Sequence, residues 1–125
     1  TSHSAYEAMF TDEAGETLEG SKGEYVLVTE APQVNAFWSI TVYDSTTGRL
    51  HPNDDDRYHI NNTTAVKNED GTFTFRFKLN CENGDVNCLE VPAGPFDVVA
   101  RYYLPEPEIM SGKWKMPHPA KVKND

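Results

Sequence analysis

Two arginine–tyrosine pairs are the side chains with the clearest capacity for chemistry. Arg57-Tyr58 follows a polar loop, and Arg101-Tyr102 lies in an alternating stretch near the end of the chain. An arginine beside aromatic rings can hold a carboxylate through two hydrogen bonds or stack on a ring. This indicates a pocket for an anionic or sugar-like ligand. The candidate ligand-binding residues are Tyr43, Asp44, Arg57, Tyr58, Arg101 and Tyr102.

A structural role for the same arginines is the competing interpretation, and we favour it. Each guanidinium would pair with an internal carboxylate, such as Asp44 or Asp97, and fix the register of its strand. The two interpretations differ in one observable feature. A ligand site requires several of these side chains to converge on a concave pocket, whereas a flat and filled sandwich supports the structural role.

Acidic and imidazole side chains gather around one loop. Asp54, Asp55 and Asp56 offer the hard oxygen ligands that calcium prefers, but they lack the alternating spacing of an EF-hand. His51 and His59 flank the loop and, with a carboxylate, would make a transition-metal site. Solvated acids and surface histidines are the simpler interpretation. We therefore expect neither a metal nor another cofactor.

The two cysteines, Cys81 and Cys88, are separated by the turn formers of Glu-Asn-Gly-Asp-Val-Asn. Such a turn brings the sulfurs together, and we favour a disulfide over two reduced thiols or a zinc site. A disulfide indicates a secreted, periplasmic or organelle-lumen location. The overlapping acceptors at Asn61 and Asn62 fit glycosylation on a secretory route, although this tripeptide is common by chance.

No complete catalytic motif is present. Ser39 lies within a regular strand pattern and lacks the strained turn that exposes a serine nucleophile. Glu106 and Glu108 are paired carboxylates on a proline-rich segment, where we expect them to be solvated. The chain also lacks a phosphate loop and a dinucleotide fingerprint. Catalysis is therefore not the favoured function.

Length and charge narrow the choices further. The chain has 125 residues and a formal charge of -9, which suits one domain and disfavours nucleic-acid and membrane-surface binding. No apolar run reaches the ~20 residues of a membrane helix. The chain does not begin with Met, so we expect a processed product or a piece of a longer protein. Opposite charges load the two ends of the chain. We favour solubility as the reason, and the alternative is that the two ends lie side by side in the fold. The acidic residues are Glu7, Asp12, Glu13, Glu16, Glu19, Glu24 and Glu30, and the basic residues are Lys113, Lys115, Lys121 and Lys123.

Period-two alternation dominates the rest of the chain. We expect strands at 25–29, 37–43, 73–79 and 96–103, with Leu79 pointing inward. A short helical turn is expected only for Ser4 to Phe10. The predicted core is Val26, Val28, Trp38, Ile40, Val42, Phe73, Phe75, Phe77, Phe96 and Val98.

These patterns predict an all-β fold, a single antiparallel β-sandwich of the jelly-roll type. Residues 1–24 form an acidic N-terminal segment, residues 25–104 form the sandwich core, and residues 105–125 form a proline-rich strap. Trp114 and Met116 are expected to fasten the strap to the sandwich. All three parts belong to one domain.

A set of motifs along the chain resembles the domain of unknown function 1214, which usually forms the C-terminal half of proteins that also carry domain 1254. The resemblance implies a jelly-roll-like sandwich, often exported, with no established activity. The matching motifs are Leu18-Glu19-Gly20 with Tyr25, Ala36 to Asp44, Arg57-Tyr58, Asp70-Gly71, Pro92 to Phe96, Arg101-Tyr102-Tyr103, and Gly112-Lys113-Trp114 with Pro117.

The chain departs from that family at two places. Asn87-Cys88-Leu89-Glu90 stands where the family usually has Asn-Trp-Leu-Pro, which implies that a disulfide replaces the packing of a large ring. The segment from His51 to Tyr58 is longer and more acidic than the family's Asn-Pro-x-Asn-Arg-Tyr motif. The partner domain is absent from this chain, so its docking surface would meet another protein or solvent.

Taken together, the sequence favours a non-catalytic structural or protein-interaction domain outside the cytosol. It would dock a protein partner or join a larger assembly through the exposed face of its strands or through its tail. The alternative is an enzyme or a small-ligand domain that binds an anionic or carbohydrate ligand through an Arg/Tyr pocket. A lectin-like module is a third and weaker hypothesis.

Overall fold

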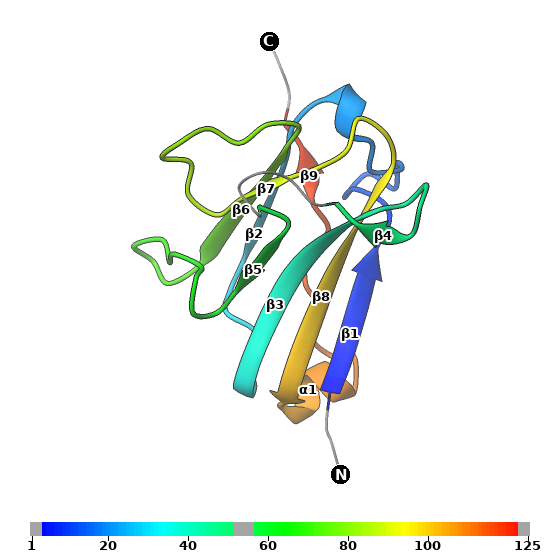
Figure 1. The fold of residues 1–125 in the computed structure, drawn as a ribbon. Helices are drawn as coiled ribbons and strands as arrows, with labels where there is room; N and C mark the ends of the chain where they lie inside the picture. Colours follow the sequence, from blue (N-terminus) through cyan, green and yellow to red (C-terminus); the bar gives the residue numbers. More distant parts are fainter. Residues whose placement is uncertain (1–3, 52–56, 123–125) are drawn as a thin grey trace.

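The computed structural model describes residues 4–51 and 57–122, which form two β-sheets packed face to face (Figure 1). The chain is all-β, and the sandwich is confirmed. Most strand pairs are antiparallel, and β6 and β7 run parallel. One sheet has the order β1-β8-β3-β4, with β5 also paired to β3: β1 (Ser4–Met9), β8 (Phe96–Pro105), β3 (Val34–Asp44), β4 (Arg49–Leu50) and β5 (His59–Asn61).

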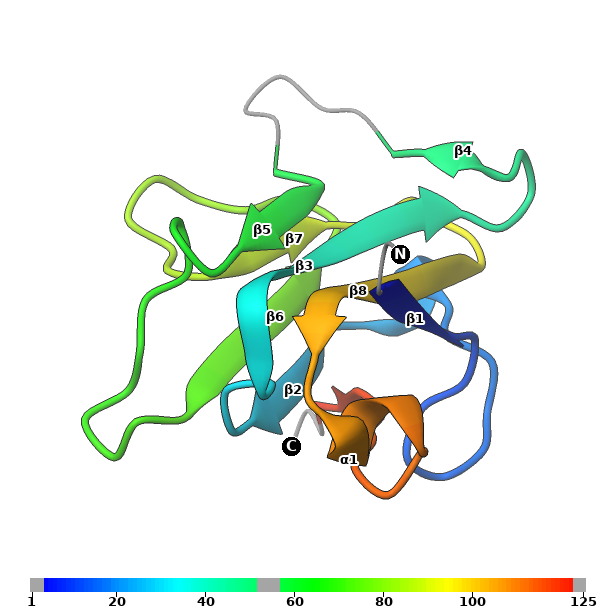
Figure 2. The same cartoon turned by 90° about the horizontal axis from the view of Figure 1, so that it is seen from below.

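The second sheet has four strands, in the order β7-β6-β2-β9. Two short helical segments complete the described elements, and α1 lies beside the end of β8 (Figure 2). The bounds of these elements are β7 (Cys88–Glu90), β6 (Phe73–Lys78), β2 (Tyr25–Thr29), β9 (Ala120–Lys121), the 3-10 helix η1 (Gly20–Lys22) and α1 (Pro107–Met110).

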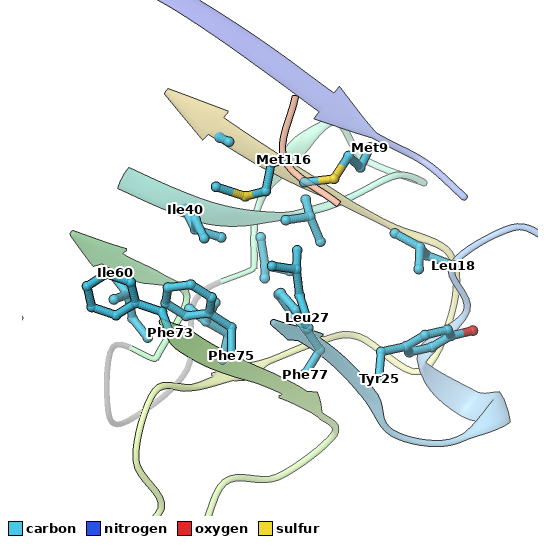
Figure 3. Packing of buried hydrophobic residues seen from close by; sticks show 14 of the residues in the cluster. Met9, Leu18, Tyr25, Leu27, Ile40, Ile60, Phe73, Phe75, Phe77 and Met116 are labelled. Carbon is cyan, nitrogen blue, oxygen red and sulfur yellow. The ribbon is translucent and has the colours of Figure 1, made fainter. Parts of the chain in front are cut away.

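The core lies between the sheets and is rich in aromatic rings. Phe73, Phe75 and Phe77 point inward from β6, as their alternation with polar residues predicted (Figure 3). The indole of Trp38 on β3 meets Phe73 edge-on, with 5.1 Å between the ring centroids. Ile40 is fully buried on the same strand. Buried rings of this size supply much of the apolar area that stabilises a small sandwich.

The predicted phase of β2 is wrong. Tyr25 and Leu27 face the core, whereas Val28 is 51% exposed and Val26 is only partly buried. The sequence Tyr-Val-Leu-Val-Thr is apolar at four consecutive positions, so alternation could not select the inward face. Pairing with β6 decides it, because Leu27 lies opposite the inward-facing Phe75.

Two further local expectations are also wrong. The segment expected as a helical turn, Ser4 to Phe10, supplies β1, which pairs antiparallel with β8 from Ser4 to Met9. Tertiary pairing overrides a weak helical pattern in so short a segment. Leu79 lies one residue beyond the end of β6 and is 42% exposed, because the alternation stops where the strand stops.

The strap runs beside the acidic first quarter of the chain, and backbone hydrogen bonds join the two segments. The backbone N–H of Glu13 donates to the carbonyl of Pro119 at 2.9 Å, and Val122 N–H donates to Glu24 at 2.8 Å. Met116 is buried in the core, and Trp114 packs edge-on against the ring of Tyr102. The strap is therefore fastened to the sandwich as expected, although it also contains α1 and β9.

Two of the motifs that carry the family resemblance are neighbours in space. Gly20 N–H donates to the carbonyl of Gly94 at 2.8 Å, and Phe96 N–H donates to the carbonyl of Leu18 at 3.1 Å. A Cβ at Gly20 would lie 1.8 Å from the carbonyl oxygen of Pro92. Only glycine fits this close approach of two backbones. Among the described helices, none is long and apolar enough to span a bilayer.

Candidate functional site

The outer face of the five-stranded sheet carries the side chains that matter most for function. Side chains alternate between the two faces of a strand, so one face of β3 and β8 packs inward and the other is left for binding. The register places Tyr6, Arg101 and Ser39 in one row across β1, β8 and β3. The outward residues are Phe37, Ser39, Thr41 and Tyr43 on β3, Asp97, Val99, Arg101 and Tyr103 on β8, and Tyr6 on β1.

Arg101 pairs with a phenol rather than with a carboxylate. Its Nη2 donates to the Tyr43 hydroxyl at 2.8 Å, and its Cζ lies 5.6 Å from the centroid of that ring. The two carboxylates expected as partners are held by a turn instead. Asp44 Oδ1 accepts from Thr46 N–H at 2.8 Å, and Asp97 Oδ1 accepts from the Ser45 hydroxyl.

A hollow of about 430 Å³ opens beside this pair. Its volume falls within the range of small-molecule sites. Val99 forms a largely buried part of the wall, whereas Tyr6 is 73% exposed. The lining residues are Tyr6, Tyr43, Gly48, Asp97, Val99 and Arg101.

His59 adds a second basic group to this face. The Nδ1 atom of His59 lies 2.8 Å from the hydroxyl of Thr41, which is on β3, the neighbour of β8. Burial lowers the pKa of His59 from its ordinary value, and the positive charge of Arg101 lowers it further. The imidazole is therefore held toward its neutral form by its surroundings.

Arg57 and Tyr58 do not join this hollow. Arg57 Nη1 donates to the backbone carbonyl of Asp85 at 3.2 Å, and Arg57 lines a separate hollow of about 300 Å³ with Asp85 and Cys88. The carbonyl of Tyr58 accepts a hydrogen bond from Val42 N–H at 2.9 Å. The structure thus separates the two arginine–tyrosine pairs.

Tyr102 faces the interior, on the opposite side of β8 from Arg101. Its hydroxyl donates to Glu7 Oε1 at 3.0 Å, and its ring is fully buried. Burial raises the pKa of Tyr102 far above its ordinary value, and the Glu7 carboxylate raises it further. Of the six candidate ligand residues, Tyr43 and Arg101 therefore meet at the hollow.

Comparison with known proteins places the chain in a family. Residues 3–107 match the model described as "Protein of unknown function (DUF1214)". The chain belongs to the DUF1214 family. In a comparison with curated proteins, none matches the chain.

Two solved structures share the fold of this DUF1214 domain. The VPA0106 protein from Vibrio parahaemolyticus is 34% identical, with a TM-score of 0.91 over 96% of this chain and 31% of that one. A putative uncharacterized protein from Burkholderia cenocepacia is 12% identical, with a TM-score of 0.61 over 95% of this chain and 29% of that one, which shows the fold alone. The chain thus spans about a third of the length of each protein.

The cysteines of the DUF1214 domain form the expected disulfide. Cys81 and Cys88 are bonded, with 6.0 Å between their Cα atoms. Their sulfurs and the Asp85 carboxylate form the one cluster of possible metal ligands in the described residues, within 4.8 Å of one another. The disulfide leaves no thiolate for a metal there. His51 and His59 are outside this cluster.

The other sites expected from the sequence remain predictions. Asp54, Asp55 and Asp56 lie outside the described residues. The Asn61 side chain accepts from Thr63 N–H at 2.9 Å, and the Asn62 side chain accepts from Trp38 N–H at 3.3 Å. Glycosylation would therefore modify side chains that already take part in local hydrogen bonds.

The candidate site residues named from the sequence did not include Tyr6 or the ring pair Phe37–Tyr103. Tyr6 was missed because its segment was expected to be helical rather than a strand of this sheet. Phe37 and Tyr103 lie opposite each other on β3 and β8, with ring centroids 4.3 Å apart, and Phe37 is 47% exposed. Alternation had placed both rings away from the predicted core, but only the pairing of β3 with β8 shows that they are neighbours.

Proposed function

We propose that this DUF1214 domain is a non-catalytic interaction domain of an exported or lumenal protein. It docks a protein partner on the outer face of the five-stranded sheet. The observation that carries the proposal is the exposed aromatic pair Phe37–Tyr103, which lies on the same face as Arg101.

This face has the composition of a binding surface. Aromatic residues and arginine dominate the energetically important centres of protein interfaces. Phe37 and Tyr6 expose large rings, and the Arg101 guanidinium between their strands retains unused donors. The sheet fixes their positions before binding, which lowers the entropic cost of association.

The interior supports a binding role over catalysis. The space between the sheets is filled by packed rings, including Trp38 against Phe73 and Phe75. Ser39 lies on a regular strand, where it pairs with Arg101, without the strained turn of a nucleophile. The hollows that involve Tyr43 and Arg57 are on the outer surface.

The disulfide supports a location outside the cytosol, because such bonds persist in oxidising compartments. The comparison with solved structures supports the view that this domain is one part of a longer protein. A domain with a TM-score of 0.91 to this one makes up 31% of a longer protein. The remaining length of that protein could supply a surface for the proposed docking.

Affinity capture from the native source tests the proposal with matched surface variants. The baits are the wild-type chain, Phe37→Ser and, as control, Val28→Ser on the outer face of the other sheet, where Val28 is similarly exposed. We expect a discrete companion protein with wild type and Val28→Ser, and its loss with Phe37→Ser. Circular dichroism checks that each bait is folded. A folded monomer without a companion, or equal capture by all three baits, counts against the proposal.

A second candidate function is the binding of a small anionic or carbohydrate ligand. It is favoured by the convergence of Arg101 and Tyr43 on the hollow of about 430 Å³. Amide chemical shifts recorded against a panel of carboxylates and glycans test it. Ligand-dependent shifts of Val99 and its neighbours are expected, and an unchanged spectrum across the panel would exclude this candidate.

A further inference from the structure

We propose that the hollow beside Tyr43 binds a small zwitterionic ligand, with its carboxylate at Arg101 and its ammonium group at Asp97. The inference rests on the second candidate function, ligand binding on the outer face, and names the chemical class of the ligand. It is independent of the docking of a protein partner.

The first observation is that two opposite charges share one hollow without neutralising each other. Asp97 and Arg101 both line it and both project from the same face of β8. The ion pairs between described residues are Arg76–Glu24 and Lys78–Asp85, and neither Asp97 nor Arg101 takes part in one. Arg101 lies four positions after Asp97 on β8, so their Cα atoms are roughly 13 Å apart. The Arg101 side chain covers part of this distance, because it reaches Tyr43, which is opposite Asp97 in the register. A ligand with two opposite charges can bridge the remaining gap.

The Arg101 end is built to receive a carboxylate. The guanidinium has five N–H donors, and the structure shows one hydrogen bond, from Nη2 to the Tyr43 hydroxyl at 2.8 Å. Because this hydroxyl accepts from Arg101, its own proton is left to donate to a ligand. A carboxylate placed here would receive charge-assisted hydrogen bonds from both side chains.

The Asp97 end is built to receive an ammonium group. Its Oδ1 accepts from the Ser45 hydroxyl, which fixes the orientation of the carboxylate. An ionised carboxylate has about four acceptor positions, so capacity remains for a cationic donor. The turn that follows β3 thus holds Asp97 ready without neutralising its charge.

The wall between the two ends is apolar. Val99 lies midway along β8 and is largely buried, and Tyr43 and Tyr6 contribute rings. The charged ends of the hollow lie closer together than the Cα atoms of Asp97 and Arg101, because the Arg101 side chain extends toward Tyr43, which is opposite Asp97 in the register. An ω-amino acid of intermediate length or a short peptide spans such a separation.

Each charged contact is weak when taken alone. A single exposed ion pair adds little free energy, whereas two contacts made by one molecule reinforce each other. The affinity should therefore depend on the length of the ligand and on the presence of both charges. This dependence distinguishes a zwitterion site from a simple anion site.

The test is a titration of the wild-type chain with ω-amino acids of increasing length, followed by amide chemical shifts. The series runs from glycine through aminobutyrate and aminohexanoate to aminooctanoate, with hexanoate and hexylamine as single-charge analogues. Triglycine separates a peptide ligand from an alkyl one. We expect the affinity to peak at an intermediate length and to exceed that of either analogue by at least about tenfold.

Three variants locate the two ends. Asp97→Asn and Arg101→Met should each lower the affinity for the best-binding zwitterion to that of a single-charge analogue. Arg76→Met, at an exposed position on the other sheet, should leave this affinity unchanged. If hexanoate binds as tightly as the zwitterions, the ligand-binding function stands and the zwitterion inference fails. If no member binds, or if Asp97→Asn has no effect, the inference is overturned.

Discussion

Arg101 hydrogen-bonds the hydroxyl of Tyr43, although two carboxylates are on the same two strands. Asp44 is at the end of β3, and Asp97 is near the start of β8. The turn after β3 explains this choice, because Thr46 and Ser45 already donate to Asp44 and Asp97. The residue types placed Arg101 and Tyr43 together in the candidate ligand site, although a structural role for the arginine was the favoured interpretation. It could not predict which acceptors a turn would occupy, because that depends on side-chain geometry rather than on strand period.

The link between Arg101 and His59 gives a prediction at the residue scale. The positive charge of Arg101 helps to hold the pKa of His59 below its ordinary value. Arg101→Met should therefore raise the pKa of His59 toward about 6.5, measured by NMR titration of the imidazole. Arg76→Met is the control and should not move it. An unchanged His59 pKa in Arg101→Met would show that the two groups do not interact.

The same shift has a consequence for stability. Because folding lowers the pKa of His59, the folded state binds fewer protons than the unfolded state near that pH. The contribution of His59 to the free energy of unfolding is therefore fully present above the pKa that His59 has in the unfolded chain. It is lost as the pH falls through the lower pKa of the folded protein. In Arg101→Met, this acid-side loss should become smaller.

The buried hydroxyl of Tyr102 gives a second residue-scale prediction. Tyr102→Phe removes the 3.0 Å hydrogen bond to Glu7 and should lower the free energy of unfolding by about 1–3 kcal/mol. Tyr103→Phe, on the outer face, is the matched control and should change it little. Urea unfolding at neutral pH measures both. Equal effects of the two variants would contradict the assigned role of Tyr102.

At alkaline pH the two variants should differ again. Folding raises the pKa of Tyr102. The contribution of Tyr102 to stability is therefore complete below a pH of about 10, which is the pKa of a tyrosine in the unfolded chain. It is lost as the pH rises above that value, because ionisation then favours the unfolded chain. Tyr102→Phe should lack this loss, and Tyr103→Phe should retain it.

At the scale of elements, sequence reasoning succeeded where polar residues mark the phase of a strand. Phe73, Phe75 and Phe77 alternate with Thr and Arg, and all three are buried as predicted. The sequence of β2 has no such polar markers, and its predicted phase is wrong. Residues Ser4–Met9 lack a strong period of either kind, so only their pairing with β8 defines them as a strand.

The corrected phase of β2 can be tested with one pair of variants. Leu27→Ala should lower the free energy of unfolding by about 2–5 kcal/mol, because it removes a fully buried side chain and leaves a cavity. Val28→Ala should stay within about 0.5 kcal/mol, since its side chain is half exposed. Chemical denaturation of both variants measures the difference. A larger effect at Val28 would restore the phase expected from the sequence.

At the scale of the whole molecule, the fold class was predictable because alternation and turn residues recur along the entire chain. The contact between the strap and the acidic first quarter was not predictable from charge, because it is made by backbone hydrogen bonds from Glu13 and Val122 and neither ion pair between described residues joins the two segments. The candidate site was predicted only in part. Arg57 and Arg101 carry the same local motif, and only the topology shows that they lie in different hollows.

The proposed docking function is a property of the whole outer face. Tyr6, Phe37 and Arg101 come from three adjacent strands, so no single segment of sequence displays the surface.

Site-specific photo-cross-linking in the native source tests the central claim most directly. A benzophenone amino acid is placed at position 37 on the proposed face and, in a second chain, at position 28 on the opposite sheet. The account predicts one discrete cross-linked adduct from position 37 and none from position 28. Adducts from position 28 alone, or none from either position, would contradict docking through the five-stranded sheet.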